Sequence, residues 1–109
     1  MVTDEWRKVE VIRYKGGGPV FKHWALYVAD KDENKPGFVC NVEGSRTRFR
    51  YVCKRTDPAN SNTLIDRYQV GYVDTDNLKK FKDFAKAKKI KNEDEYWNCQ
   101  DWVWEMCKS

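Results

Sequence analysis

The chain has 109 residues, of which 40% are hydrophobic and 15% aromatic, with a net charge of +4. This size suits a single domain over residues 1–109 with one core, and the aromatic content excludes a disordered chain. The charge is too mild to indicate nucleic-acid binding by itself, and no apolar stretch is long enough to predict a transmembrane helix. No apolar signal segment opens the sequence, so we expect a cytoplasmic protein.

The first two thirds of the chain favour β-strands. Apolar and polar residues alternate there, and the segments are rich in aromatic and β-branched side chains. Residues 15–19, with three Gly and a Pro, predict a loop. Gly44 and Ser45 predict the turn of a hairpin, and Gly71 predicts a bulge. The predicted strands are residues 5–14, 20–30, 38–44, 47–55 and 63–74.

The last third of the chain changes to a helical period. Residues 75–90 predict a helix capped by Thr75 or Asp76, and residues 98–109 predict a second helix with Asn98 as its N-cap. Strands followed by helices are typical of an α+β protein. We therefore expect an antiparallel sheet of four or five strands followed by two C-terminal helices.

Four cysteines raise the question of disulfides and metals. Cys99 and Cys107 would be separated by about 12 Å along the last helix, too far to be bridged. Cys40 and Cys53 remain able to pair across two strands. The chain has one His and no C-x-x-C pattern, so we expect neither a metal nor an organic cofactor.

Cys99 is the first residue of the last predicted helix. Free backbone N–H groups and the positive end of the helix dipole meet there, and both stabilise a thiolate. Cys99, Trp102, Val103 and Met106 recur at helical spacing and share one face. We expect this face to pack on the sheet, with the sulfur directed toward the strands.

Two polar residues on the predicted strands suit a reactive thiol. His23 shares a strand face with Ala25 and Tyr27, where the small alanine leaves room beside the imidazole. Asn41 is a polar amide inside an apolar strand, and a His ring nitrogen would satisfy it. A Cys–His–Asn set is an established solution for nucleophilic catalysis. The backbone N–H of Cys99 or Gln100 would then stabilise an oxyanion.

The segments "HWALYV" (23–28) and "NCQDWV" (98–103) resemble the two signature segments of permuted NlpC-like papain-fold proteins. The lecithin:retinol acyltransferase-like group is the most similar. The resemblance implies a thiol hydrolase or acyltransferase that acts on an amide, ester or thioester carbonyl. Cys99 would be the nucleophile and His23 its base, and Asn41 would occupy the third position, on the next strand. Tyr27 and Trp97 would line the substrate cleft with Gln100.

The chain departs from this group at two places. Lipid-acting members usually carry a second His where Asn41 stands, and they have "NCEH" where this chain has "NCQD". These differences point away from lipid substrates and toward a peptide, amide or other acyl substrate.

A binding function is the alternative. Cys99 on its own would more often be a buried structural thiol, and His23 a satisfied, partly buried histidine. The first of the two predicted helices, residues 75–90, is rich in lysine, and with Lys91 and the arginines of residues 46–55 it would form a basic surface. A non-catalytic module of the same fold would bind a protein or an anionic surface there, with weak contact to membranes. No nucleic-acid motif is present. The lysines are Lys79, Lys80, Lys82, Lys86, Lys88, Lys89 and Lys91.

Overall fold

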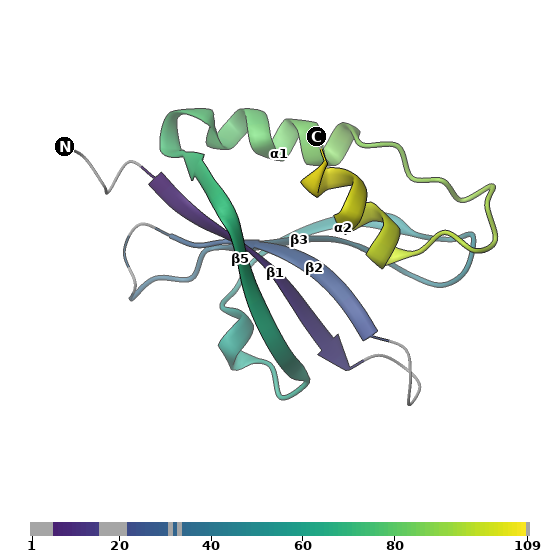
Figure 1. The fold of residues 1–109 in the computed structure, drawn as a ribbon, viewed down its shortest axis with the longest axis horizontal. Coiled ribbons are helices and arrows are strands. Elements are labelled where there is room, and N and C mark those ends of the chain that lie inside the picture. The colour runs from purple at the N-terminus through teal and green to yellow at the C-terminus, as the bar shows by residue number, and fades with distance from the viewer. Residues whose placement is uncertain (1–5, 16–21, 31, 33, 109) are drawn as a thin grey trace.

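The computed structural model describes residues 6–15, 22–30, 32 and 34–108. Its strands form one antiparallel sheet in the order β4-β3-β2-β1-β5 (Figure 1). The predicted α+β class, an antiparallel sheet followed by two C-terminal helices, is confirmed. The strands are β1 (Trp6–Lys15), β2 (Lys22–Val28), β3 (Phe38–Glu43), β4 (Arg50–Arg55) and β5 (Leu64–Asp74).

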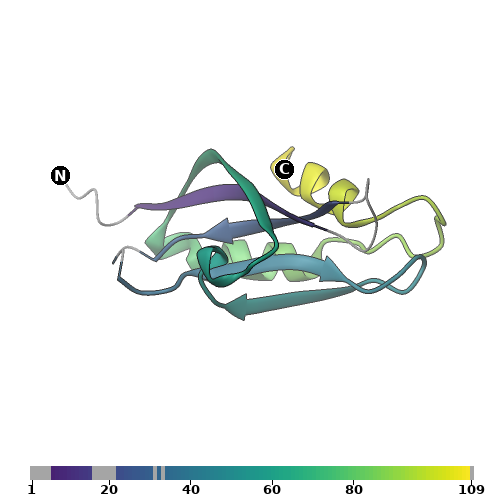
Figure 2. The same cartoon turned by 90° about the horizontal axis from the view of Figure 1, so that it is seen from below.

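Both helices cover the same face of the sheet. The chain leaves β5 through a 3₁₀ turn, η3 (Thr75–Asn77), enters α1 (Leu78–Ala87) and later α2 (Cys99–Cys107). Figure 1 shows α1 and α2 on one side of the strands, and Figure 2 shows the sheet from its other side. On that side the short 3₁₀ helix η2 (Pro58–Asn60) connects β4, at one edge, to β5, at the opposite edge.

The main core lies between the sheet and the helices. Trp102 of α2 is fully buried at its centre, and Ala85 contributes from α1. Alternate residues of the strands supply the other wall, as the period of two requires. A smaller cluster of Ile12, Ala25, Tyr27 and Val39 occupies the opposite face. The strand residues of the main core include Val9, Val11, Leu26, Val28, Phe38, Cys40 and Val42.

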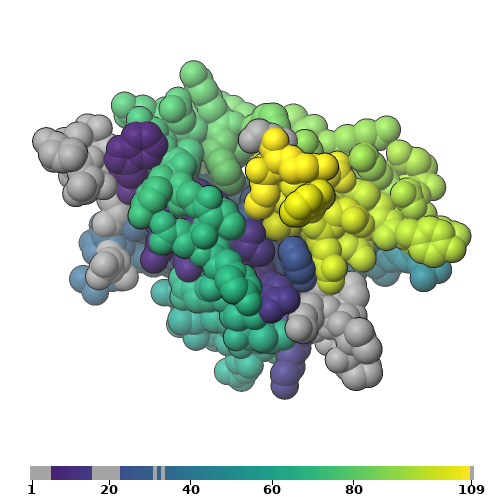
Figure 3. Space-filling model, viewed as in Figure 1, coloured from purple at the N-terminus to yellow at the C-terminus, as the bar shows by residue number. Residues whose placement is uncertain are grey.

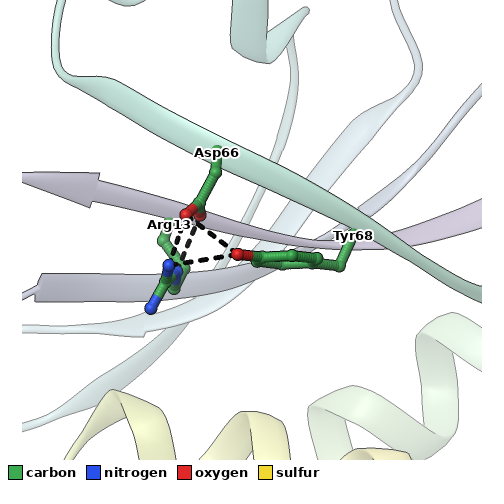
Figure 4. A network of polar contacts seen from close by, with 3 residues as sticks. All are labelled: Arg13, Asp66 and Tyr68. Atoms are coloured by element: carbon green, nitrogen blue, oxygen red, sulfur yellow. Dashed lines mark hydrogen bonds and ion pairs between the residues drawn. The ribbon is translucent and has the colours of Figure 1, made fainter.

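A polar network joins β5 to β1 near the end of the sheet (Figure 4). Arg13 Nε donates to Asp66 Oδ1 at 2.7 Å, its Nη2 pairs with Asp66 Oδ2, and the Tyr68 hydroxyl donates to the same carboxylate. The Arg13 guanidinium also lies 5.9 Å from the ring centre of Trp24 and 5.4 Å from that of Tyr68. These contacts fix the edge strand against the sheet.

The structure tests the predicted bulge and the bounds of the first predicted helix. The bulge is confirmed, since Val9 pairs with Gly71 and Glu10 with Gln69, which leaves Val70 without a partner residue on β1. The same pairing shows a second irregularity between Arg13 and Tyr14, which the sequence did not indicate. The predicted helix over 75–90 begins as the 3₁₀ turn and ends at Ala87 as α1.

The predicted caps Thr75 and Asp76 are wrong. The Asp74 side chain accepts the Asp76 N–H at 2.9 Å, one residue before the predicted position. The cause is the 3₁₀ turn, which starts earlier than an α-helix would and needs its cap there.

The fourth strand starts at Arg50 rather than at the predicted residue 47. Thr47 has a positive φ of 64°, which a strand does not allow. The backbone N–H and C=O of Phe49 bond to the side chain of Asn92, outside the sheet. Residues 16–19 of the predicted loop, and residues 20 and 21 of the second predicted strand, lie outside the described residues.

Across the part of the chain that the structure describes, no helix is both long and apolar enough to cross a membrane.

Candidate active site

Helix α2 begins at the predicted cysteine with a complete capping box. Asn98 is the N-cap, as the sequence predicts, and its Oδ1 accepts the Gln100 N–H at 2.9 Å. The Asp101 carboxylate accepts the Asn98 N–H at 2.9 Å in return. These two bonds satisfy backbone donors that an uncapped helix would leave unpaired, and they fix the position of Cys99.

The Cys99 thiol is buried between α2 and the sheet, with 1% of the residue exposed. Figure 3 shows α2, in yellow, packed over this face of the molecule. Burial raises the pKa of the thiol, because a thiolate loses its hydration there. Nearby backbone N–H groups, those of Trp24, Cys99 and Gln100, favour the thiolate and oppose this rise in pKa.

His23 and Asn41 lie together, as the sequence predicts. The distance between His23 Nε2 and Asn41 Nδ2 is 2.6 Å, and Asn41 Nδ2 also lies 3.4 Å from Glu43 Oε2. The Tyr14 ring stacks on the imidazole, with 6.2 Å between ring centres. Burial lowers the pKa of His23, and the nearby Glu43 carboxylate offsets part of this shift in pKa.

Cys99 packs against β2 near the point where the pairing between β2 and β3 ends. Pairing between these strands covers only Leu26–Val28 with Phe38–Cys40, so Trp24 lies beyond it. Its backbone N–H favours the thiolate form of Cys99 and so acts against the rise in pKa that burial causes. The sulfur thus lies against the peptide that joins His23 to Trp24.

The side chains of Cys99 and His23 belong to opposite faces of the sheet. Cys99 packs in the core under the helices with Leu26 and Val28, whereas His23 lies on the face of Ala25 and Tyr27. Among the described residues no hydrogen bond joins Cys99 to His23. The structure therefore brings His23 and Asn41 together and places the thiol beside the backbone of His23, not beside its ring.

A cavity of about 320 Å³ opens next to the His23–Asn41 pair, on the sheet face opposite α1 and α2. Its walls combine apolar surface with side chains of both signs of charge, Lys54 on one hand and Glu43 and Asp57 on the other. Its lining residues are Tyr14, His23, Val39, Asn41, Glu43, Lys54, Thr56, Asp57, Asn60 and Ser61.

The three predicted cleft residues lie apart from this cavity. The Gln100 N–H is bonded to the Asn98 cap. Trp97 is buried in the main core, where its Nε1 donates to Glu105 Oε2 at 2.9 Å. Tyr27 is buried on the other face, and its hydroxyl accepts the Gly37 N–H at 2.9 Å. Trp97 and Tyr27 have structural partners that account for their positions.

Two residues near His23 were absent from the predicted site. Glu43 is the nearest carboxylate to the His23–Asn41 pair, and the alternation that puts it on the face of Asn41 was visible in the sequence. Tyr14 is the cross-strand partner of His23, a register that only the structure supplies. In the described residues no group of three or more His, Cys, Asp or Glu is arranged to bind a metal ion.

Comparison with known proteins places the chain in one family. No curated protein and no solved structure matches it. One family model matches residues 9–109. This range includes β1 from Val9 onward, the other four strands and both helices. The chain therefore belongs to DUF6540, a family of unknown function.

Proposed function

We propose that this protein is a cysteine-dependent hydrolase or acyltransferase, with Cys99 as nucleophile, His23 as base and Asn41 as the residue that orients His23. The observation that carries the proposal is the contact between His23 Nε2 and Asn41, combined with a helix-start thiol against the His23–Trp24 peptide. Order along the chain also supports it, since the His strand, the Asn strand and the Cys helix follow as in permuted NlpC-like papain-fold proteins.

The imidazole nitrogen that contacts Asn41 is Nε2. Nε2 is far from the backbone, whereas Nδ1 is on the side of the ring that borders the main chain. The backbone N–H of Trp24, the next residue along that main chain, favours the thiolate form of Cys99. Because the imidazole and the sulfur lie on opposite faces of the sheet, transfer of the thiol proton to Nδ1 requires a rearrangement of this end of β2.

Asn41 can then fix the protonation of the ring. An Asn amide presents either oxygen or nitrogen after a half turn. With Oδ1 toward His23, it accepts Nε2–H and leaves Nδ1 unprotonated, which is the tautomer that a general base needs. Glu43, 3.4 Å from the amide, takes the Nδ2 side.

The resting pair is a neutral thiol and a neutral imidazole. Burial raises the pKa of Cys99 and lowers the pKa of His23, so neither shift favours an ion pair. The proton moves during attack: the Cys99 sulfur bonds to the carbonyl carbon as Nδ1 takes the thiol proton. The imidazolium returns this proton to the leaving amine, alcohol or thiol, and an acyl-thioester remains on Cys99. Water or an acceptor then releases the acyl group.

Acylation by a small activated ester tests this scheme. We expect p-nitrophenyl acetate to add one acetyl group to the peptide that contains Cys99, with release of nitrophenol, and His23→Ala to slow this by about 100-fold or more. Because the thiol is 1% exposed, larger esters should react more slowly. Intact and peptide mass spectrometry with stopped-flow absorbance provide the measurement.

Cys107 supplies the matched control, because it is an exposed cysteine at the other end of the same helix. Cys107→Ser should leave both the adduct and the rate unchanged, whereas Cys99→Ser should remove the rapid phase. Equal acetylation of Cys99 and Cys107, or a Cys99→Ser variant as fast as the wild type, would rule out the proposed nucleophile.

The alternative, a binding module that uses the basic helix, has weaker support. Lys79 pairs with Asp83, Lys89 with Glu93, and Lys91 with Glu105. These carboxylates partly neutralise the lysines, so the segment offers less positive charge to an anionic partner than its sequence suggests.

A further inference from the structure

Two other cysteines face each other across the far edge of the sheet. Cys40 of β3 and Cys53 of β4 are direct cross-strand partners. Their sulfur atoms are 3.5 Å apart, and both are free thiols. Neither residue has a role in the proposed acyl transfer.

The strands already provide the backbone geometry of a disulfide. Facing residues in an antiparallel pair have Cα atoms about 4.5–5.5 Å apart. Bridged cysteines have Cα atoms about 4.4–6.8 Å apart. A bond between Cys40 and Cys53 therefore requires a rotation of side chains and no displacement of β3 or β4.

The two thiols differ in access. Cys53 is exposed on β4, the edge strand, whereas Cys40 is fully buried in the main core. Burial raises the pKa of the Cys40 thiol, and the Tyr51 hydroxyl lies 3.5 Å from its sulfur. An oxidant from solvent thus meets Cys53 first, with Cys40 behind it as the only sulfur within 4 Å among the described residues.

We propose that Cys40 and Cys53 form a redox modification site, which a peroxide converts into a reversible disulfide between β3 and β4. The Cys53 sulfur attacks one peroxide oxygen, the O–O bond breaks, and a sulfenic acid and one water result. Cys40 then attacks the Cys53 sulfur; the S–O bond breaks, and its oxygen leaves with the Cys40 proton as a second water. In sum, two thiols and one hydrogen peroxide give one disulfide and two waters.

The bond has a structural consequence. It closes a loop that contains the β3–β4 turn, in which Gly44 and Thr47 have positive φ. A covalent link across this loop restricts the unfolded chain and ties the edge strand to the sheet. The disulfide form should therefore melt at a temperature higher by about 5 °C or more.

Peptide mapping after peroxide treatment tests the site. We expect the reduced full-length chain, treated with hydrogen peroxide and then alkylated, to yield one cross-linked peptide pair that contains Cys40 and Cys53. Dithiothreitol should restore both free thiols and the lower melting temperature. In Cys40→Ser, which lacks the resolving thiol, dimedone should label Cys53 as a sulfenic acid.

Two exposed cysteines allow a matched comparison. Cys107→Ser should keep the cross-link, and Cys53→Ser should abolish it, while both variants keep a buried Cys40. The proposal is wrong if peroxide takes Cys53 to sulfinic or sulfonic acid without a cross-link. It is equally wrong if the disulfides join separate chains, or if Cys107 takes part as readily as Cys53.

Discussion

His23 has an environment unlike that of a histidine on the protein surface. It has Asn41 at Nε2, the Tyr14 ring on its face and the Glu43 carboxylate nearby. Burial nevertheless dominates and lowers its pKa below the ordinary value of 6.5. The folded chain therefore binds a proton at His23 less readily than the unfolded chain does.

Stability should consequently fall as His23 becomes protonated. Between the folded and unfolded pKa values the unfolded state binds more protons, so the free energy of unfolding decreases as the pH drops below 6.5 and through the lower folded pKa. His23→Gln should remove this part of the pH dependence. Urea unfolding at about pH 7.5 and about pH 5.5 measures it, for both proteins.

The sequence makes this comparison specific, because His23 is the only histidine in the chain. Asp and Glu side chains are also present, but their ordinary pKa values lie well below this interval, at about 4. Parallel losses of stability in the wild type and in His23→Gln would show that the imidazole has the same proton affinity in both states.

At the scale of the elements, the start of α2 contains both a complete helix cap and the cysteine that we propose as nucleophile. The capping box of Asn98 and Asp101 satisfies two backbone N–H groups and places Cys99 in the first turn. The same cap occupies the Gln100 N–H, which is one of the donors that the proposed acyl transfer would use for an oxyanion. The bond that stabilises the start of α2 and positions the thiol therefore leaves the Gln100 N–H less available to a substrate.

Asn98→Ala should lower the free energy of unfolding by about 1 kcal/mol, because it removes the side-chain acceptor for the Gln100 N–H. Asn98→Ser is the matched variant: it retains an oxygen at the cap and should stay within about 0.5 kcal/mol of the wild type. Urea unfolding followed by Trp fluorescence compares them. An equal loss in both variants would mean that another interaction of Asn98, not the cap, matters.

At the scale of the whole molecule, periodicity identified the strands and helices but not the spatial relation of the site residues. Alternation correctly grouped His23 with Ala25 and Tyr27, and helical spacing correctly grouped Cys99 with Trp102. Neither pattern indicates which sheet face the helices cover. That choice depends on which face can bury Trp102, and it leaves the imidazole on the opposite side.

The order of the strands in the sheet could not be predicted from the sequence either. The antiparallel hairpin of β3 and β4 follows from a short connection, but β5 pairs with β1, at the edge farthest from β4. This long-range pairing depends on the segment around η2, which crosses the open face and forms part of the cavity beside His23. The polar wall of that cavity therefore appears only in the folded chain, whereas the His23–Asn41 contact was predictable from two strand patterns.

Trp102 links the helices to the sheet and tests how this core is stabilised. The residue is fully buried and its ring lies 6.0 Å from that of Tyr51, yet Nε1 has no hydrogen-bond partner among the described residues. Trp102→Ala should cost about 4 kcal/mol of unfolding free energy, because it removes the ring and leaves a cavity. Trp102→Phe should cost only about 1 kcal/mol, since the loss of packing is offset by removal of an unsatisfied buried donor.

The exposed Trp104, two residues along the same helix, provides the reference for these substitutions. Trp104→Phe should change the free energy of unfolding by less than about 0.5 kcal/mol. Chemical denaturation of the three variants at one pH gives the comparison. If Trp102→Phe were as destabilising as Trp102→Ala, the indole N–H would have a partner that stabilises it, and the core under α2 would depend on a polar contact rather than on packing alone.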